Sequence, residues 1–301
     1  MEFLIPTANR RVEVVMVKNF TRILVTLPFV LMTGGALADH NPGHAQSRVA
    51  QLEGRVAALE AIVQVLTSAI TVSADGKNVF FDGVNVHIRN GDPAEVTNLV
   101  NGLGNLIIGY NEDTLGLSND RTGSHNLIVG PEHSYPSFGG FVAGLGNTIS
   151  GEHASVTGGN GNAARSDHSA ILGGTGNTTA NVSPPKEVPV GLAATISGGS
   201  DNIATGDFAS VSGGSNNTAS ANGTSVSGGK GNIANNDLAS ISGGRSNTAS
   251  GQDASVSGGW NNTASGEGAS ISGGHGCTEA RDQGWSVGDT DILTTGCTTS
   301  N

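Results

Sequence analysis

The chain has 301 residues, of which 47 are glycine, 4% are aromatic and 13% are charged. This composition supplies too few large apolar side chains for a conventional globular core, and the low charge argues against charge-driven disorder. The class that remains is a repeat architecture that stacks small residues. The formal net charge of −11 argues against nucleic acid and acidic membrane surfaces as partners.

Residues 1–38 have the order of a secretory signal peptide. Lys18 and Arg22 precede the apolar run ILVTLPFVLM, and small residues follow up to Ala38. Met16 is an alternative start. The apolar run is short for a membrane span, so no integral span is expected in the mature chain, with a retained anchor as the alternative. The sequence predicts an exported protein, secreted or held at the cell surface, with a linker over 39–47.

Residues 48–71 predict an α-helical coiled coil. Apolar residues recur in steps of three and four, as in a heptad seam: Val49, Leu52, Val56, Leu59, Val63, Leu66 and Ile70. An amphipathic helix packed on a domain is the alternative. Residues 72–98 are expected to be a connecting β segment.

Two features of the sequence give opposing indications of the number of helices in this coiled coil. Valine at a with leucine at d favours dimers. The repeated Arg-h-x-x-h-Glu pattern, in contrast, resembles a trimerisation signature, in which Arg48 and Arg55 reach Glu53 and Glu60 of the neighbouring chain. Two copies of the signature favour a homotrimer.

A phrase such as SVSGGWNNTASG recurs with a fixed, fifteen-residue period in the second half of the chain. An apolar column keeps this register: Val156, Ile171, Ile196, Val211, Val226, Ile241, Val256 and Ile271. An asparagine column does the same: Asn147, Asn162, Asn177, Asn202, Asn217, Asn232, Asn247 and Asn262. A repeat of this length suits two short strands and two tight turns. The sequence therefore predicts an all-β solenoid, a parallel β-roll or β-helix, over 152–276 with an insertion at 182–191.

Side-chain alternation predicts which columns face inward. In ASVSGG, Val211 faces one side while Ser210 and Ser212 face the other, and the apolar side must be the interior. An inward asparagine in every coil would form a ladder of buried amides. Cys277 falls in the same column as the asparagines, which supports an inward-facing column.

A looser repeat precedes the regular coils. Asn105, Asn126 and Asn147 are evenly spaced in GNLIIG, HNLIVG and GNTISG, at a longer interval than the regular period. The sequence therefore predicts that 99–151 forms coils of the same solenoid with long loops.

Cys277 and Cys297 are the two cysteines of the chain. In an oxidising compartment a disulfide between them would close the tail, 277–301, over the last coil. Such a cap would also block edge-to-edge pairing. A buried thiol together with an exposed thiol is the alternative.

The phrase ASVSGGSNNTASG resembles the YadA-like head repeats of trimeric autotransporter adhesins, over residues 140–276. The resemblance implies a trimeric, left-handed β-roll and an adhesive role. The period is one residue longer than that of the usual head repeat, and the coiled coil precedes the solenoid instead of following it. The C-terminal sequence GWSVGDTDILTTGCTTSN has no amphipathic barrel strands, so the resemblance is to the head alone.

The sequence predicts no enzymatic activity, no catalytic residues and no cofactor. Asp and Glu fall in turns at varying columns, without a recurring pair suited to acid and base roles. His153 and His168 share a column in adjacent coils, but structural zinc prefers four ligands, so no metal is expected.

The function predicted from these features is that of an adhesive surface fibre, which self-associates and binds an unidentified host, matrix or cell-surface ligand. Loops of the first coils would carry specificity, with these candidate residues: Tyr110, Asp113, Arg121, His133 and Tyr135. The alternative is that these loops only cover the open end of the solenoid. One alternative is an ice- or crystal-binding solenoid that uses Ser-x-Ser columns. Another is a phage-like fibre or a polysaccharide-acting protein.

Overall fold

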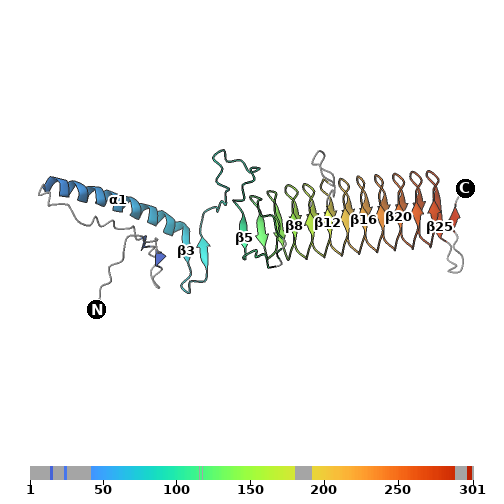
Figure 1. Ribbon diagram of the computed structural model, residues 1–301, viewed down its shortest axis with the longest axis horizontal. Coiled ribbons are helices and arrows are strands. Elements are labelled where there is room, and N and C mark those ends of the chain that lie inside the picture. The colour runs from blue at the N-terminus through green and yellow to red at the C-terminus, as the bar shows by residue number, and fades with distance from the viewer. Residues whose placement is uncertain are drawn as a thin grey trace. The chain divides into compact units, whose positions relative to one another are not determined.

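A computed structural model describes residues 14–15, 24–25, 42–114, 116, 118–179, 192–288 and 297–299 (Figure 1). The chain divides into two compact units, 1–87 and 88–301. Most of the predicted signal peptide and the insertion at 182–191 lie outside the described residues. Within the former, Val14–Val15 (β1) pairs antiparallel with Leu24–Val25 (β2).

In the described part of the first unit, helix α1 covers Pro42–Ala69. Proline is favoured in the first turn of a helix, and the Ala, Leu, Gln, Glu and Arg residues that follow have high helix propensity. The helix therefore begins inside the predicted linker. It ends where Ile70–Val72 (β3) starts, and β3 pairs antiparallel with Val79–Phe81 (β4). Ile70 consequently belongs to a strand and not to the predicted seam.

The second unit is a parallel β-solenoid, in which strands of successive coils pair in register (Figure 1). One sheet has 13 strands: Leu106–Ile108 (β5), Leu127–Val129 (β6), Phe141–Ala143 (β7), Ser155–Val156 (β9), Ala170–Ile171 (β11), Thr195–Ile196 (β13), Ser210–Val211 (β15), Ser225–Val226 (β17), Ser240–Ile241 (β19), Ser255–Val256 (β21), Ser270–Ile271 (β23), Trp285–Gly288 (β25) and Cys297–Thr299 (β26). The other sheet has nine strands: Thr148–Ile149 (β8), Ala163–Ala164 (β10), Thr178–Thr179 (β12), Ile203–Ala204 (β14), Thr218–Ala219 (β16), Ile233–Ala234 (β18), Thr248–Ala249 (β20), Thr263–Ala264 (β22) and Thr278–Glu279 (β24). The predicted all-β solenoid is thus confirmed.

A third ladder lies between the two sheets, where each coil turns from the 13-stranded sheet into the nine-stranded sheet. It consists of single residues joined by parallel bridges, and we call it the bridge column: Leu145, Asn160, Thr175, Ser200, Ser215, Lys230, Arg245, Trp260 and His275.

The interior of the solenoid contains one apolar column and one amide ladder. All eight residues of the apolar column are at most 1% exposed, and so are the eight asparagines. The backbone N–H of Asn217 donates to Oδ1 of Asn202 at 3.0 Å, and its Nδ2 donates to Gly213 O at 2.9 Å and Gly229 O at 3.1 Å. Each buried amide is therefore hydrogen-bonded within its own coil and to its neighbours.

The register of the first coils differs from that of the regular coils. Strand β5 pairs with β6, and β6 pairs with β7 in the 13-stranded sheet, whereas Asn147 is followed by β8 of the nine-stranded sheet. Asn105 and Asn126 precede β5 and β6, and Oδ1 of Asn126 accepts a hydrogen bond from Gly140 N at 2.8 Å. These two asparagines therefore form a separate short ladder at another corner of the coil. They do not share a column with Asn147, whose backbone N–H donates to His133 instead.

The solenoid continues beyond the predicted boundary at 276, since β24 and β25 still pair with the preceding coils. Strand β26 then pairs antiparallel with β25, which covers the outer edge of the 13-stranded sheet. Cys277 is 0% exposed and disulfide-bonded. Cys297 lies opposite Gly288 in the β25–β26 pair. Its side chain is outside the described residues, so the pairing of Cys277 with Cys297 stays a prediction.

Candidate functional site

The structure separates the five residues predicted for recognition. Tyr110 is 92% exposed, and Asp113 is exposed beside it in sequence. Arg121 is half-buried, while His133 is 0% and Tyr135 is 4% exposed. The prediction that His133 and Tyr135 belong to an exposed recognition surface is wrong, because both side chains fill the interior of the first coils.

His133 is an internal rung of the asparagine ladder. Its Nδ1 accepts the backbone N–H of Asn147 at 3.2 Å, and its Nε2 lies 3.0 Å from Val129 O. The backbone N–H of His133 donates in turn to Oδ1 of Asn111 at 2.8 Å. This arrangement assigns the proton of a neutral imidazole to Nε2, and burial lowers the pKa of His133. The ladder therefore extends through His133 to Asn111.

The loop before His133 is held by a buried carboxylate. Glu132 is 1% exposed and accepts hydrogen bonds from Thr114 Oγ1 at 2.6 Å and Asn119 Nδ2 at 3.3 Å. The Nε and Nη2 atoms of Arg121 are buried without a hydrogen-bond partner among the described residues. The loop that carries Tyr110 and Asp113 is thus anchored on the first coils by groups that face inward.

The Ser-x-Ser columns lie on the outer face of the 13-stranded sheet. Ser212, Ser227 and Ser257 are exposed, whereas the first serine of each pair is half-buried. Ser255 Oγ donates to Ser270 Oγ at 3.1 Å. Hydroxyl groups of adjacent coils are therefore close enough to bond to one another.

The predicted histidine pair stacks at the surface. The ring centroids of His153 and His168 are 5.3 Å apart at an interplanar angle of 21°, and those of Phe138 and His153 are 5.0 Å apart in a T-shaped arrangement. No group of three or more potential metal ligands occurs among the described residues. The two imidazoles consequently form part of an aromatic row.

A column of acidic residues in the turns was not predicted from the sequence. Asp167 Oδ1 accepts the backbone N–H of Glu152 at 2.8 Å, one coil away, and Asp282 Oδ1 accepts that of Glu267 at 3.1 Å. The same bond joins Asn222 N to Asp237 Oδ1 at 3.2 Å. These carboxylates tie together the turns that lead from the nine-stranded sheet to the 13-stranded sheet. Aligning the sequence by its repeat period reveals this column.

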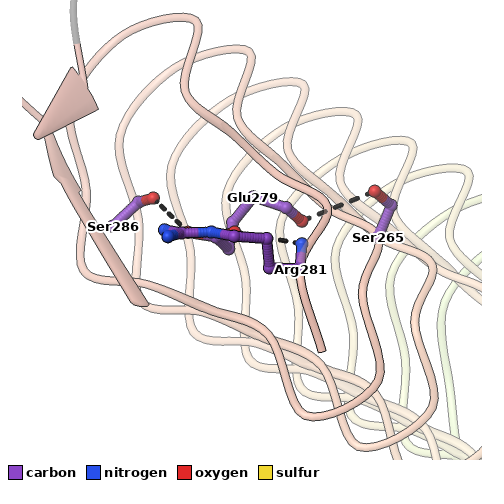
Figure 2. Close-up of polar contacts among 4 residues, drawn as sticks. All are labelled: Ser265, Glu279, Arg281 and Ser286. Atoms are coloured by element: carbon purple, nitrogen blue, oxygen red, sulfur yellow. Dashed lines mark hydrogen bonds and ion pairs between the residues drawn. The ribbon is translucent and has the colours of Figure 1, made fainter. Parts of the chain in front are cut away.

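The C-terminal coil contains a buried carboxylate, that of Glu279, which is shown with its hydrogen-bond partners in Figure 2. Glu279 occupies the register position of Ala264 and is 1% exposed. Arg281 donates from Nε at 3.0 Å and from Nη2 at 2.9 Å to the two carboxylate oxygens, and Ser286 Oγ donates at 2.7 Å (Figure 2). These hydrogen bonds, that of Arg281 first, lower the pKa of Glu279 to about 2. A Cβ on Gly284 would lie 2.5 Å from the carboxylate, so glycine leaves room for it.

Comparison with protein-family models and with curated proteins found no match to this sequence. Among the described residues, no helix combines the length and apolar character needed to cross a membrane.

Proposed function

We propose that this protein is an exported, non-enzymatic adhesive fibre, in which α1 assembles three chains and the solenoid presents a repeated polar surface to a cell or matrix ligand. The observation that carries the proposal is the exposed apolar stripe of α1. Val49, Leu52 and Val56 are 52%, 55% and 51% exposed. A heptad stripe of this kind is stabilised when other helices cover it.

The trimer is favoured by the charge pattern that flanks the stripe. Arg48 and Arg55 precede the apolar positions, and Glu53 and Glu60 follow them, so each arginine can pair with a glutamate of the next chain. The resemblance of the solenoid repeat to YadA-like heads favours the same number. Sedimentation equilibrium of the full chain tests this part: we expect the mass of three chains, and a monomer or dimer contradicts it.

A matched pair of helix variants tests the role of the stripe. Leu59→Lys places a charge in the seam, whereas Ala58→Lys places the same charge one residue away, outside it. We expect Leu59→Lys to yield monomers and Ala58→Lys to leave the assembly intact. Equal effects of the two substitutions contradict assembly through this stripe.

Adhesion itself is tested at the exposed loop of the first coils. Tyr110 has the most exposed large apolar side chain of the described chain, and aromatic residues on a rigid support are frequent anchors of recognition. We expect Tyr110→Ala to reduce binding to cells or matrix without a change in melting temperature. Unchanged adhesion of this variant contradicts a role of the Tyr110 loop in binding.

A second candidate function is favoured by the exposed serine column of the 13-stranded sheet. Hydroxyl groups repeat there at the spacing of adjacent strands, about 4.8 Å, in the regular manner of an ice- or crystal-binding surface. Thermal hysteresis of the purified protein distinguishes this candidate from adhesion. A freezing point that equals the melting point of ice contradicts it.

A further inference from the structure

Four consecutive rungs of the bridge column carry cationic or aromatic side chains, and we call them the cationic ridge: Lys230, Arg245, Trp260 and His275. All four are exposed, Trp260 at 52%. The five earlier rungs of the column are uncharged: Leu145, Asn160, Thr175, Ser200 and Ser215. The same Gly-Gly pair precedes each of these four residues. The repeat pattern around the position is therefore constant and does not explain why cationic and aromatic residues occur there.

The backbone of the ridge is rigid. Arg245 N donates to Gly259 O at 2.9 Å, and Arg245 O accepts from Asn261 N at 2.9 Å. The neighbouring rung, Trp260, is bonded to the next coil at the same two atoms. The side chains therefore project from a hydrogen-bonded backbone, and binding requires ordering of their rotamers but not of the backbone.

The positive charge of the ridge is not neutralised by the chain. Residues 192–288 contain three Lys or Arg residues, and Arg281 pairs with Glu279. Neither Lys230 nor Arg245 forms an ion pair within the described residues. The carboxylates of the acidic column lie in the turn on the other side of each coil. An anion can therefore approach the ridge without displacing a partner.

The aromatic end of the ridge is also suited to polar ligands. Trp260 and His275 stack with ring centroids 4.3 Å apart and an interplanar angle of 11°. A stack between adjacent rungs runs along the solenoid axis, so ring edges, which are electropositive, remain for a ligand. No hydrogen bond from the indole N–H of Trp260 occurs within the described part of the chain.

We propose that the cationic ridge binds a linear anionic polysaccharide, carrying sulfate or carboxylate groups, along the solenoid axis. Adjacent rungs are about 4.8 Å apart, close to the length of one sugar unit in an extended chain. Successive units would therefore meet successive rungs, with Lys230 and Arg245 binding the anionic groups. The exposed indole of Trp260 contributes apolar contact and one hydrogen-bond donor. This inference rests on the proposed adhesive function and adds the class of ligand.

The test measures binding of the full chain to immobilised dextran sulfate, alginate, neutral dextran and single-stranded DNA. We expect binding to dextran sulfate or alginate that weakens between about 50 mM and 200 mM salt, since ion pairs with a polyanion release counterions. Dextran sulfate and alginate distinguish sulfate from carboxylate as the anionic group. Binding to neither polymer, or equal binding to neutral dextran or to DNA, overturns the proposal.

A charge-matched pair of variants locates the site. Arg245→Gln removes a charge from the ridge, and Arg165→Gln removes the same charge from an exposed position after β10. We expect Arg245→Gln, like Lys230→Gln, to weaken binding several-fold and to lower the salt slope by about one. Arg165→Gln should change neither. Equal losses in the two arginine variants overturn the assignment to the ridge.

Tryptophan fluorescence provides a second readout. The chain has two tryptophans, Trp260 and Trp285, so Trp285→Phe leaves the ridge residue as the sole reporter. We expect its emission to shift when the polysaccharide binds, and unchanged emission with bound polymer overturns the proposal. Ridge-dependent binding without cell adhesion contradicts the adhesive function alone, whereas adhesion without binding to any anionic polysaccharide contradicts the ridge alone.

Discussion

Asn147 donates its backbone N–H to Nδ1 of His133 at 3.2 Å, so an imidazole accepts the hydrogen bond that an amide oxygen accepts in every later coil. An asparagine side chain has a single charge state, whereas an imidazole gains a proton and loses Nδ1 as an acceptor. The N-terminal end of the amide ladder is therefore the pH-sensitive end.

The stability of the first coils should decrease in mild acid. Burial lowers the pKa of His133 in the folded chain below 6.5, the value in the unfolded chain. Between these two values the unfolded chain binds more protons, so stability is fully present above 6.5 and is lost as the pH falls through the folded value. Hydrogen exchange of the Asn147 amide measures this. His133→Asn restores an amide rung and should remove the pH dependence; a variant that keeps it contradicts the assignment to His133.

Loss of one rung from the middle of the ladder should be costly. Asn217→Ala leaves the backbone N–H of Asn232 without its acceptor in the interior, which costs at least about 2 kcal/mol. Asn222→Ala is the control, since Asn222 is exposed in a turn of the same coil. Chemical denaturation compares the two, and equal midpoints would show that the ladder contributes no stability.

The two glycines of each Gly-Gly pair should differ sharply in their tolerance of alanine. Gly214 has a φ of +84°, and a Cβ there would lie 2.2 Å from Gly229 O of the next coil. Gly213 has no atom within 4 Å of its Cβ position. We expect Gly214→Ala to cost about 2–4 kcal/mol and Gly213→Ala to stay within about 0.5 kcal/mol. Thermal melting that ranks them in the opposite order contradicts the register of the coils.

The C-terminal coil should be sensitive to stronger acid than the first coils. The pKa of Glu279 is lowered from 4.5 to about 2, so its contribution is present above 4.5 and is lost as the pH falls toward 2. Glu279→Gln should abolish this acid-dependent part of the melting curve, whereas Glu267→Gln, at an exposed turn position, should preserve it. An unchanged acid profile in Glu279→Gln excludes Glu279 as the titrating group.

The sequence by itself determined the regular part of this protein. A strict repeat period reproduces the same local environment in each coil, so alternation alone predicts that Val211 and Asn217 face inward and that Ser212 faces outward. The heptad spacing likewise predicts the helix, because helix formation depends on neighbours a few residues apart.

Tertiary structure decided what the period cannot specify. The long loops of the first coils erase the register, so only strand pairing shows that His133, and not Asn126, continues the ladder through Asn147. Residues far apart in the chain also become neighbours through stacking: Lys230, Arg245 and Trp260 stand one full period apart in the sequence and form adjacent rungs. These side chains are far apart along the chain, and only the stacking of coils brings them within one strand spacing of each other.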